Sequence, residues 1–201
     1  MLPAAVLLVR LFFDFEERHL QQWSFPSAAD WEIGSEANNH FLNLRKAGPI
    51  GAPRRPLQFA LVKDLCLGDF TLRVKVRRAG RSMLIVFGYV DTLHFYYAHL
   101  SADSGDHRVH NGLFKVDGGE RFRLAGEGAA PALPDQNWHE AKIARKDSSG
   151  DIQVFIDGDQ EPRFRHADAS FRFGRIGLGS FDETGSFDDL RVEGESSHAC
   201  K

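Results

Sequence analysis

A group of tyrosine, histidine and arginine side chains in the middle of the chain has the residue types that bind polar ligands. Tyr97 and His99 stand two positions apart in a segment of strand-forming residues, so their side chains share one face. Aromatic rings can stack on a ligand, while histidine and arginine can hydrogen-bond to its hydroxyl groups. The predicted ligand-binding residues are Tyr97, His99, His110, Asn111 and Arg121.

Other interpretations of this group stay open at the level of sequence. His94 and Tyr96 occupy the opposite face of the same segment, and one of the two pairs should point away from the core. Tyrosines are often amphipathic core residues and histidines are common on surfaces, so the whole group can be structural. A zinc site on the histidines is disfavoured because their spacing follows no metal-binding pattern.

An aspartate near the end of the chain raises a second chemical question. In the segment from Phe187 to Glu193, alternation of side chains places Asp188 on the same face as Leu190 and Val192. A carboxylate on a partly buried face needs a cation, an arginine or backbone N–H groups as its partner. The sequence does not decide between these partners.

Short strands and tight turns are expected to position these residues, since the chain has 19 glycines and 17 phenylalanines. The segment from Asp69 to Arg77 alternates apolar and polar residues and predicts a strand with one buried face. Ser82 to Val90 is apolar on both faces and predicts a central strand, and Leu93 to Leu100 is expected to follow as the third strand of a meander. Gly48 to Pro56 is rich in proline and glycine and predicts an irregular loop.

The remaining expected strands are separated by turn residues at intervals of roughly 8 to 12 residues, the pattern of an antiparallel sandwich. They span Leu11 to Glu16, Asp30 to Gly34, Asn43 to Arg45, Leu57 to Leu61, His110 to Val116, Arg121 to Ala125, Trp138 to Arg145, Asp151 to Asp157, Pro162 to His166, Arg175 to Phe181 and Phe187 to Glu193. Trp138 begins one of them and is expected to cap an edge of the core. The predicted fold class is all-β, a two-sheet antiparallel β-sandwich.

Length and composition support a single globular domain. The chain has 201 residues, of which 42% are hydrophobic and 26% charged, and its formal net charge is −3. This charge offers no bulk attraction to nucleic acid or to an anionic membrane. We expect one domain over residues 11–194 and a polar tail over residues 195–201. Residues 1–10 are expected to be either an export-signal remnant or an extra strand, and for residues 1–9 the remnant is favoured. This segment is too short to span a bilayer.

The two cysteines predict little chemistry. Cys66 lies in an apolar stretch and is expected to be a buried small residue, while Cys200 lies in the polar tail. A disulfide between them is disfavoured, and two cysteines do not support a structural zinc site.

Three stretches in the second half of the chain carry a resemblance to a known superfamily. They are WHEAKIARKDSSGDIQVFIDG from Trp138, FGRIGLGSF from Phe173 and FDDLRVEG from Phe187. Together they resemble the concanavalin A-like lectin/glucanase superfamily, and in particular its laminin-G-like modules and the related domain of 3-keto-disaccharide hydrolases. The resemblance covers residues 12–194 and implies a jelly roll, but this fold hosts lectins, hydrolases, lyases and adhesion modules alike.

The same resemblance implies a structural calcium ion. Many members of the superfamily hold Ca²⁺ where the first and last strands meet, and the positions that match their ligands here are Asp14 and Asp188. Backbone carbonyls would complete such a site, whose role would be stability. The alternative is that Asp188 bonds backbone N–H groups and that Asp14 pairs with an arginine.

Catalysis finds less support in the residues. Retaining glycosidases of this superfamily need carboxylates on one strand face, in a Glu-x-Asp-x-Glu or similar arrangement. Asp157, Asp159 and Glu161 have that spacing, but Gly158 and Pro162 place them in a turn. No serine lies in a nucleophile-elbow motif either.

The resemblance and the polar cluster together predict a carbohydrate-binding or accessory module that is secreted or periplasmic. One alternative is a glycoside hydrolase of the 3-keto-disaccharide hydrolase type, for which His99, His110 and Arg121 would be the residues to suspect. Another is a protein–protein adhesion module, as many laminin-G-like domains are. The expected partner is a glycan, with no nucleic acid and no membrane span.

Overall fold

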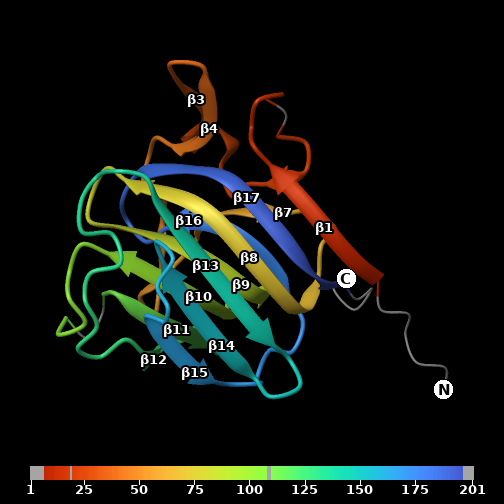
Figure 1. The fold of residues 1–201 in the computed structure, drawn as a ribbon, viewed down its shortest axis with the longest axis vertical. Coiled ribbons are helices and arrows are strands. Elements are labelled where there is room, and N and C mark those ends of the chain that lie inside the picture. Colours follow the sequence, from red (N-terminus) through yellow and green to blue (C-terminus); the bar gives the residue numbers. More distant parts are fainter. Residues whose placement is uncertain (1–6, 19, 108–109, 197–201) are drawn as a thin grey trace.

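Two antiparallel sheets packed face to face form the molecule (Figure 1), and the predicted two-sheet β-sandwich is confirmed. The computed structural model describes residues 7–18, 20–107 and 110–196. A single short 3₁₀ helix, Ala28–Asp30, interrupts the strands of the described part.

The first sheet has eight strands. Its order is β15 (Phe164–Ala167), β14 (Asp151–Ile156), β13 (His139–Lys146), β8 (Leu67–Arg78), β17 (Gly185–Ser196), β4 (Asn39–Leu44) and β3 (Trp31–Glu36), with β1 (Leu7–Phe13) also paired to β17. The hairpin of β3 and β4 projects beyond the body of the sandwich, and β1 runs along one side (Figure 1).

The second sheet has seven strands. Its order is β12 (Glu120–Ala125), β11 (Gly112–Asp117), β10 (His94–Ser101), β9 (Ser82–Asp91), β16 (Arg175–Ser180), β7 (Gln58–Val62) and β2 (Trp23–Ser24). The segment predicted as an irregular loop contains two further two-residue strands, β5 (Ile50–Gly51) and β6 (Arg55–Pro56), which pair with each other.

The expected meander of three consecutive strands is wrong. β8 belongs to the first sheet and β9 to the second, so only β9 and β10 pair as neighbours. The two strands differ because β8 has one polar face, which lies in solvent, whereas β9 is buried on both faces. Ile85 and Phe87 pack between the sheets, and Leu84 and Val86 pack in a second apolar cluster on the outer face of the second sheet.

The last strand connects both ends of the chain to the first sheet. One edge of β17 pairs with β8, and the other pairs with β4 at its start and with β1 from Leu190 onward. The predicted adjacency of the first and last strands is therefore confirmed. β1 includes Leu7 to Arg10, so these residues belong to the sheet, in agreement with the extra strand that the sequence left open for residues 1–10. Residues 1–6 lie outside the described part.

A bulge changes the orientation of side chains along β17. The register shifts between Asp188 and Arg191, and Asp189 has a φ of 48°. Asp188 pairs with the outward-facing Lys75, whereas Leu190 and Val192 face the core. The expectation that Asp188 shares a face with these two residues is wrong, because the extra residue of a bulge breaks the period of two.

Two further expectations concern the cysteines and membranes. Cys66 is buried as expected, with 3% of its surface exposed, and it is disulfide-bonded, although the sequence disfavoured a disulfide. Cys200 lies outside the described residues. Within the described residues, no helix has the length and apolar character needed to cross a membrane.

Candidate functional site

The predicted ligand-binding residues gather on the outer face of the second sheet, but most of them are buried. Tyr97 on β10 is 0% exposed and stacks on Phe114 of β11, with ring centroids 5.1 Å apart and an interplanar angle of 9°. His99, two residues along the same face, is 2% exposed. These rings belong to an apolar cluster and offer no open face to a ligand.

Arginine side chains and one phenylalanine cover this cluster. Cζ of Arg54, from the segment between β5 and β6, lies 4.8 Å from the centroid of the Phe181 ring, and Nη2 of Arg54 lies 2.8 Å from Oδ2 of Asp182. Cζ of Arg121 lies 5.1 Å from the Phe181 centroid and 5.7 Å from that of Phe114. Arg121 therefore lies at the predicted place, but it covers aromatic rings there.

The Tyr97 hydroxyl is the unusual polar group beneath this cover. It is buried, and none of the described residues meets it with good hydrogen-bond geometry, although the guanidinium of Arg121 lies near enough to interact with it. Burial raises the pKa of the Tyr97 hydroxyl well above its usual value, and the positive charge of Arg121 offsets this only in part. The hydroxyl is thus held neutral and does not face solvent.

The histidines of the predicted site form a chain of contacts. Nε2 of His99 lies 2.9 Å from Oγ of Ser82, and the His99 and His110 rings lie 5.4 Å apart. Nδ1 of His110 lies 2.6 Å from Oδ2 of Asp103. His110 is partly exposed, so it is the member of the group that solvent reaches.

Asn111 holds a neighbouring loop in place. Its side chain is fully buried, its Oδ1 accepts a hydrogen bond from the Ala132 amide at 2.9 Å, and its Nδ2 donates to the Ala130 carbonyl at 2.8 Å. Contact between Asn111 and a ligand is not compatible with this packing. Ligand binding by the other four predicted residues stays a prediction.

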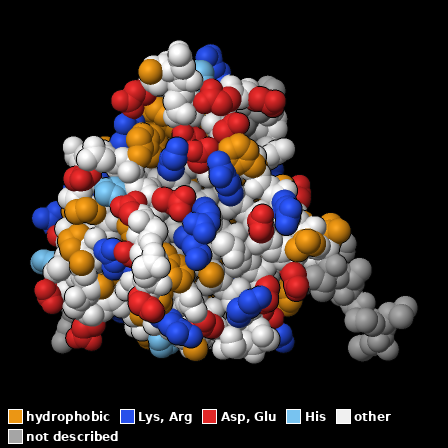
Figure 2. Space-filling model, in the orientation of Figure 1, with side chains coloured by type: hydrophobic (Ala, Val, Ile, Leu, Met, Phe, Trp, Pro, Cys, Tyr) orange, Lys and Arg blue, Asp and Glu red, His pale blue; other side chains and the backbone are white. Residues whose placement is uncertain are grey.

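A different surface is open to solvent. A groove of about 750 Å³ lies on the outer face of the first sheet, where β8, β17, β4 and β3 run side by side. Figure 2 shows this side of the molecule, with basic and acidic side chains interspersed over the strands. The groove is lined by Glu32, Gly34, Ser35, Phe41, Asn43, Leu44, Arg45, Arg77, Arg78, Ala79, Gln136, Thr184, Gly185 and Ser186.

The floor of the groove is a row of polar side chains, one from each of four neighbouring strands. Arg77 pairs with Ser186, Ser186 with Asn43, and Asn43 with Glu32 in the strand registers. Oγ of Ser186 donates to Oδ1 of Asn43 at 3.1 Å, and Nδ2 of Asn43 donates to Oε1 of Glu32 at 2.9 Å. Arg45 adds a bond to the other oxygen of Glu32 at 3.3 Å. The hydrogen bonds fix the orientation of each group.

Phe41 forms the apolar part of the groove, and Trp138 lies against it beside the groove. Phe41 and Trp138 meet edge to face with centroids 5.5 Å apart, and Cζ of Arg77 lies 4.6 Å from the Trp138 ring. Gly34 makes room for this arrangement, because a Cβ there would lie 2.3 Å from the Phe41 ring. Trp138 is half-buried, so part of its indole ring remains accessible.

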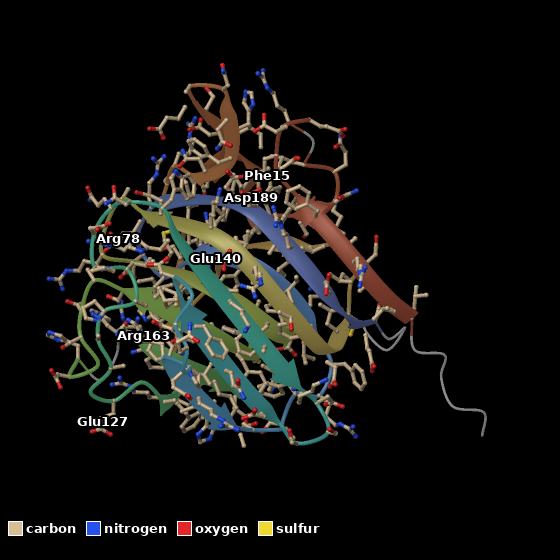
Figure 3. All side chains as sticks on the ribbon, in the orientation of Figure 1. Phe15, Arg78, Glu127, Glu140, Arg163 and Asp189 are labelled. Atoms are coloured by element: carbon tan, nitrogen blue, oxygen red, sulfur yellow. The ribbon has the colours of Figure 1, made fainter. Side chains whose placement is uncertain are left out.

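Arginines shape the ends of the groove. Nη1 of Arg77 pairs with Oε2 of Glu36 at 2.7 Å. Arg78, labelled in Figure 3 at one end of the first sheet, donates from its guanidinium to the carbonyls of Gly80, Leu133 and Pro134. Arg78 thereby ties the segment before β13 to the end of β8 and keeps that wall of the groove in place.

Sequence reasoning missed this groove for an identifiable reason. The alternation of β8 predicts that Arg77 faces solvent, and Trp138 was expected only to cap the edge of the core. The partners of both residues, Phe41 and the row through Asn43, come from the hairpin of β3 and β4, far away in the sequence. The local signal was an aromatic residue at the start of an otherwise alternating strand.

The residues expected to bind calcium have other partners in the structure. Oδ2 of Asp188 accepts a hydrogen bond from Nδ2 of Asn39 at 2.9 Å, and its Oδ1 accepts one from the Asp189 amide at 2.7 Å. Burial raises the pKa of Asp188 despite these donors. Oδ1 of Asp14 accepts a bond from the Glu16 amide at 3.2 Å.

The surroundings of these two carboxylates do not fit a calcium site well. Ca²⁺ takes six to eight oxygen ligands, roughly, and usually more than one carboxylate. Among the described residues, no group of three or more His, Cys, Asp or Glu side chains is placed to hold a metal ion. Asp189, next to Asp188 at the upper end of β17 in Figure 3, pairs with Lys75 at 2.7 Å. Calcium binding stays a prediction.

Comparison with known proteins shows the fold. No protein-family model and no curated protein matches the chain. Among solved structures, the carbohydrate-binding module CBM66 from Bacillus subtilis is similar with a TM-score of 0.60 at 17% identity, covering 86% of this chain and 95% of that one. The jelly-roll β-sandwich implied by the sequence resemblance is therefore confirmed as the fold.

Two further similar structures carry sugars. Domain 4 of AbnA, an extracellular arabinanase from Geobacillus stearothermophilus in complex with arabinotriose, has a TM-score of 0.59 at 10% identity and covers 96% of this chain and 94% of that one. The acidic lectin of winged bean, complexed with methyl-α-D-galactose, has a TM-score of 0.59 at 11% identity and covers 95% of this chain and 99% of that one. At these identities the likeness concerns the fold.

Proposed function

We propose that this protein is a carbohydrate-binding module and that its glycan lies in the groove on the outer face of the first sheet. The observation that carries the proposal is the combination of accessible Trp138 with a fixed row of polar groups across four strands. The sugar-bound arabinanase domain and lectin of the same fold support the ligand class.

The chemistry of the groove matches that of a sugar. A pyranose or furanose ring has an apolar face, which packs on an indole, and hydroxyl groups that both donate and accept hydrogen bonds. Asn43 uses one of its two amide hydrogens on Glu32, and Arg45 has further N–H groups beyond its bond to the same carboxylate. Because these groups are already oriented, binding costs little side-chain entropy.

The charges in the groove favour a neutral glycan. Glu32 is paired with Arg45, and Glu36 with Arg77, so two of the arginines are balanced. The guanidinium of Arg78 is engaged by three carbonyl groups. An acidic sugar would have to compete with the existing carboxylates for Arg45 and Arg77.

The groove gives the hydrolase alternative no independent support. The glutamate that lines the groove, Glu32, is paired with Arg45, and Glu36 nearby is paired with Arg77, so neither carboxyl group is free to act as a general acid. An adhesion module would not need the ordered polar row. We therefore rank binding of a glycan above both alternatives, and export to the periplasm or medium, where polymeric glycans occur, is part of the proposal.

The test is a glycan array followed by calorimetry on the best ligand. Trp138→Ala should lower affinity at least about tenfold, the effect expected of an aromatic hot spot. Phe12→Ala is a matched control, because Phe12 also lies on the first sheet, is 51% exposed and stacks under Arg191 at 4.8 Å. Equal losses in both variants, or no binding to any glycan, would contradict the proposal.

A further inference from the structure

A histidine next to Trp138 lies between two aspartates. Nδ1 of His139 is 2.6 Å from Oδ2 of Asp157, and its Nε2 is 3.1 Å from Oδ1 of Asp135. The ring is 8% exposed, so water competes little for either nitrogen. The two aspartates come from different elements: Asp135 from the loop before β13, and Asp157 from the turn after β14.

The loop held by this histidine contributes Gln136 to the wall of the groove. Oδ1 of Asp135 also accepts a hydrogen bond from the backbone amide of Asn137 at 2.8 Å, and Nε2 of Gln136 donates one to the Ala79 carbonyl at 2.7 Å. Gln136 lines the groove, and Trp138 follows two residues later. Displacement of Asp135 would therefore move both the polar and the aromatic side of this wall.

The number of protons on the His139 ring decides whether both bonds exist. A protonated imidazole donates from both nitrogens and can bond to both carboxylates, whereas a neutral imidazole donates from only one. The shorter contact is to Asp157, so a neutral ring should keep its proton on Nδ1. The lone pair of Nε2 would then face the Asp135 carboxylate, and that contact would become repulsive.

The groups that surround the His139 ring indicate that the bond to Asp135 is the one lost when the ring is neutral. The charged side chains in contact with it are Asp135 and Asp157, while β8 contributes Val76 opposite His139 in the strand register. Oδ1 of Asp157 accepts a hydrogen bond from the backbone amide of Glu140 at 2.8 Å, so this carboxylate is held in place by β13. The contact of His139 with Asp135 is the longer of the two, and Asp135 is slightly more exposed than Asp157. Asp135 is therefore the partner whose bond to the ring should break first.

We propose that His139 positions the Asp135–Trp138 wall of the groove and that loss of its second proton loosens this wall and weakens ligand binding. The binding half of this inference rests on the proposed function. Loss of one proton removes one of the two donors of the ring, so binding should be tighter at acidic than at alkaline pH. We expect the affinity to fall about tenfold when this proton is lost, the size usual for coupling between two sites.

A contrasting histidine shows why the arrangement matters. Nε2 of His40 lies 2.7 Å from Nη2 of Arg18, and its Nδ1 lies 2.8 Å from Oε2 of Glu16. A guanidinium can only donate, so Nε2 of His40 accepts from Arg18. His40 precedes Phe41, which lines the groove, and a proton added to its Nε2 would break the bond with Arg18 instead of forming a second one.

The direct test uses 5-fluorotryptophan labelling and ¹⁹F NMR on the full chain. The resonance of Trp138, assigned with Trp138→Phe, should shift with one inflection as the pH is raised and the ring of His139 loses a proton. Asp135→Asn should remove the inflection without unfolding the protein, because the amide can accept from a protonated ring or donate to a neutral one. Asp91→Asn, the same change beside His94 at the β9–β10 turn, should leave it intact.

The outcomes separate the two proposals. No inflection for wild-type Trp138, or the same inflection in Asp135→Asn, overturns the role of His139. An inflection in a protein that binds no glycan at any pH supports the role of His139 in the wall and overturns the proposed function. An inflection that coincides with the change in glycan affinity, with both lost in Asp135→Asn, supports both.

Discussion

The two outer faces of the sandwich carry similar residue types and use them differently. On the second sheet, Phe114 and Tyr97 are stacked and covered by Arg54, Arg121 and Phe181. On the first sheet, Arg77 also lies against aromatic rings, but the indole of Trp138 stays partly accessible beside a groove. Aromatic residues on an outer face therefore do not by themselves indicate a binding surface, because aromatic rings covered by other side chains form a second hydrophobic core.

The comparison is sharpest for the stability of the two faces. Phe114→Ala should lower the free energy of unfolding by about 3 to 5 kcal/mol, the usual cost of removing a buried phenylalanine. Trp138→Ala should cost no more than about 2 kcal/mol, because its ring is only partly buried. Urea unfolding of both variants measures this difference, and equal losses would show that the Trp138 region is packed as a core.

A smaller effect is expected from the unpartnered hydroxyl under the cover of the second sheet. Tyr97→Phe should leave stability unchanged or raise it by up to about 1 kcal/mol, since removal of a buried polar group without a partner relieves a desolvation cost. The same urea experiment checks this, with Tyr89→Phe as a control whose residue is 8% exposed. A clear loss of stability in Tyr97→Phe would mean that the hydroxyl has a bonded partner and that this face holds an organised polar site.

The smallest effect is expected from removal of calcium. The oxygens of Asp188 already accept bonds from Asn39 and from the Asp189 amide, so we expect a chelator to leave the melting temperature unchanged. Differential scanning calorimetry with and without added Ca²⁺ measures this. A lower melting temperature with chelator, abolished by Asp188→Ala, would instead establish the calcium site that the sequence resemblance implies.

Much of the fold was predictable from local pattern. The alternation of Phe70, Leu72, Val74 and Val76 indicated one buried face of β8, and the turn residues separated most strands within a few positions of their ends. The adjacency of the first and last strands followed from the superfamily resemblance. These features depend on residues close together in the sequence or on a motif that spans the chain.

The parts that were not predictable depend on long-range contacts. The bulge at Asp189 places Asp188 on the face opposite to the expected one, and the residue types around Asp189 give no sequence signal for a bulge. The cover over Tyr97 comes from Arg54 and Phe181, which are distant in the sequence. The same holds for the contact of Phe41 with Trp138, so the groove could not be assembled from strand patterns alone.

NMR chemical-shift perturbation on the labelled protein can map the bound glycan directly. We expect the groove to be the binding site: titration with the best array ligand should shift the indole N–H of Trp138 and the side-chain amide of Asn43, and should leave His99 and Arg121 on the second sheet unchanged. Perturbations centred on His99, His110 and Arg121, with Trp138 silent, would contradict it and would place binding on the face that the sequence first suggested.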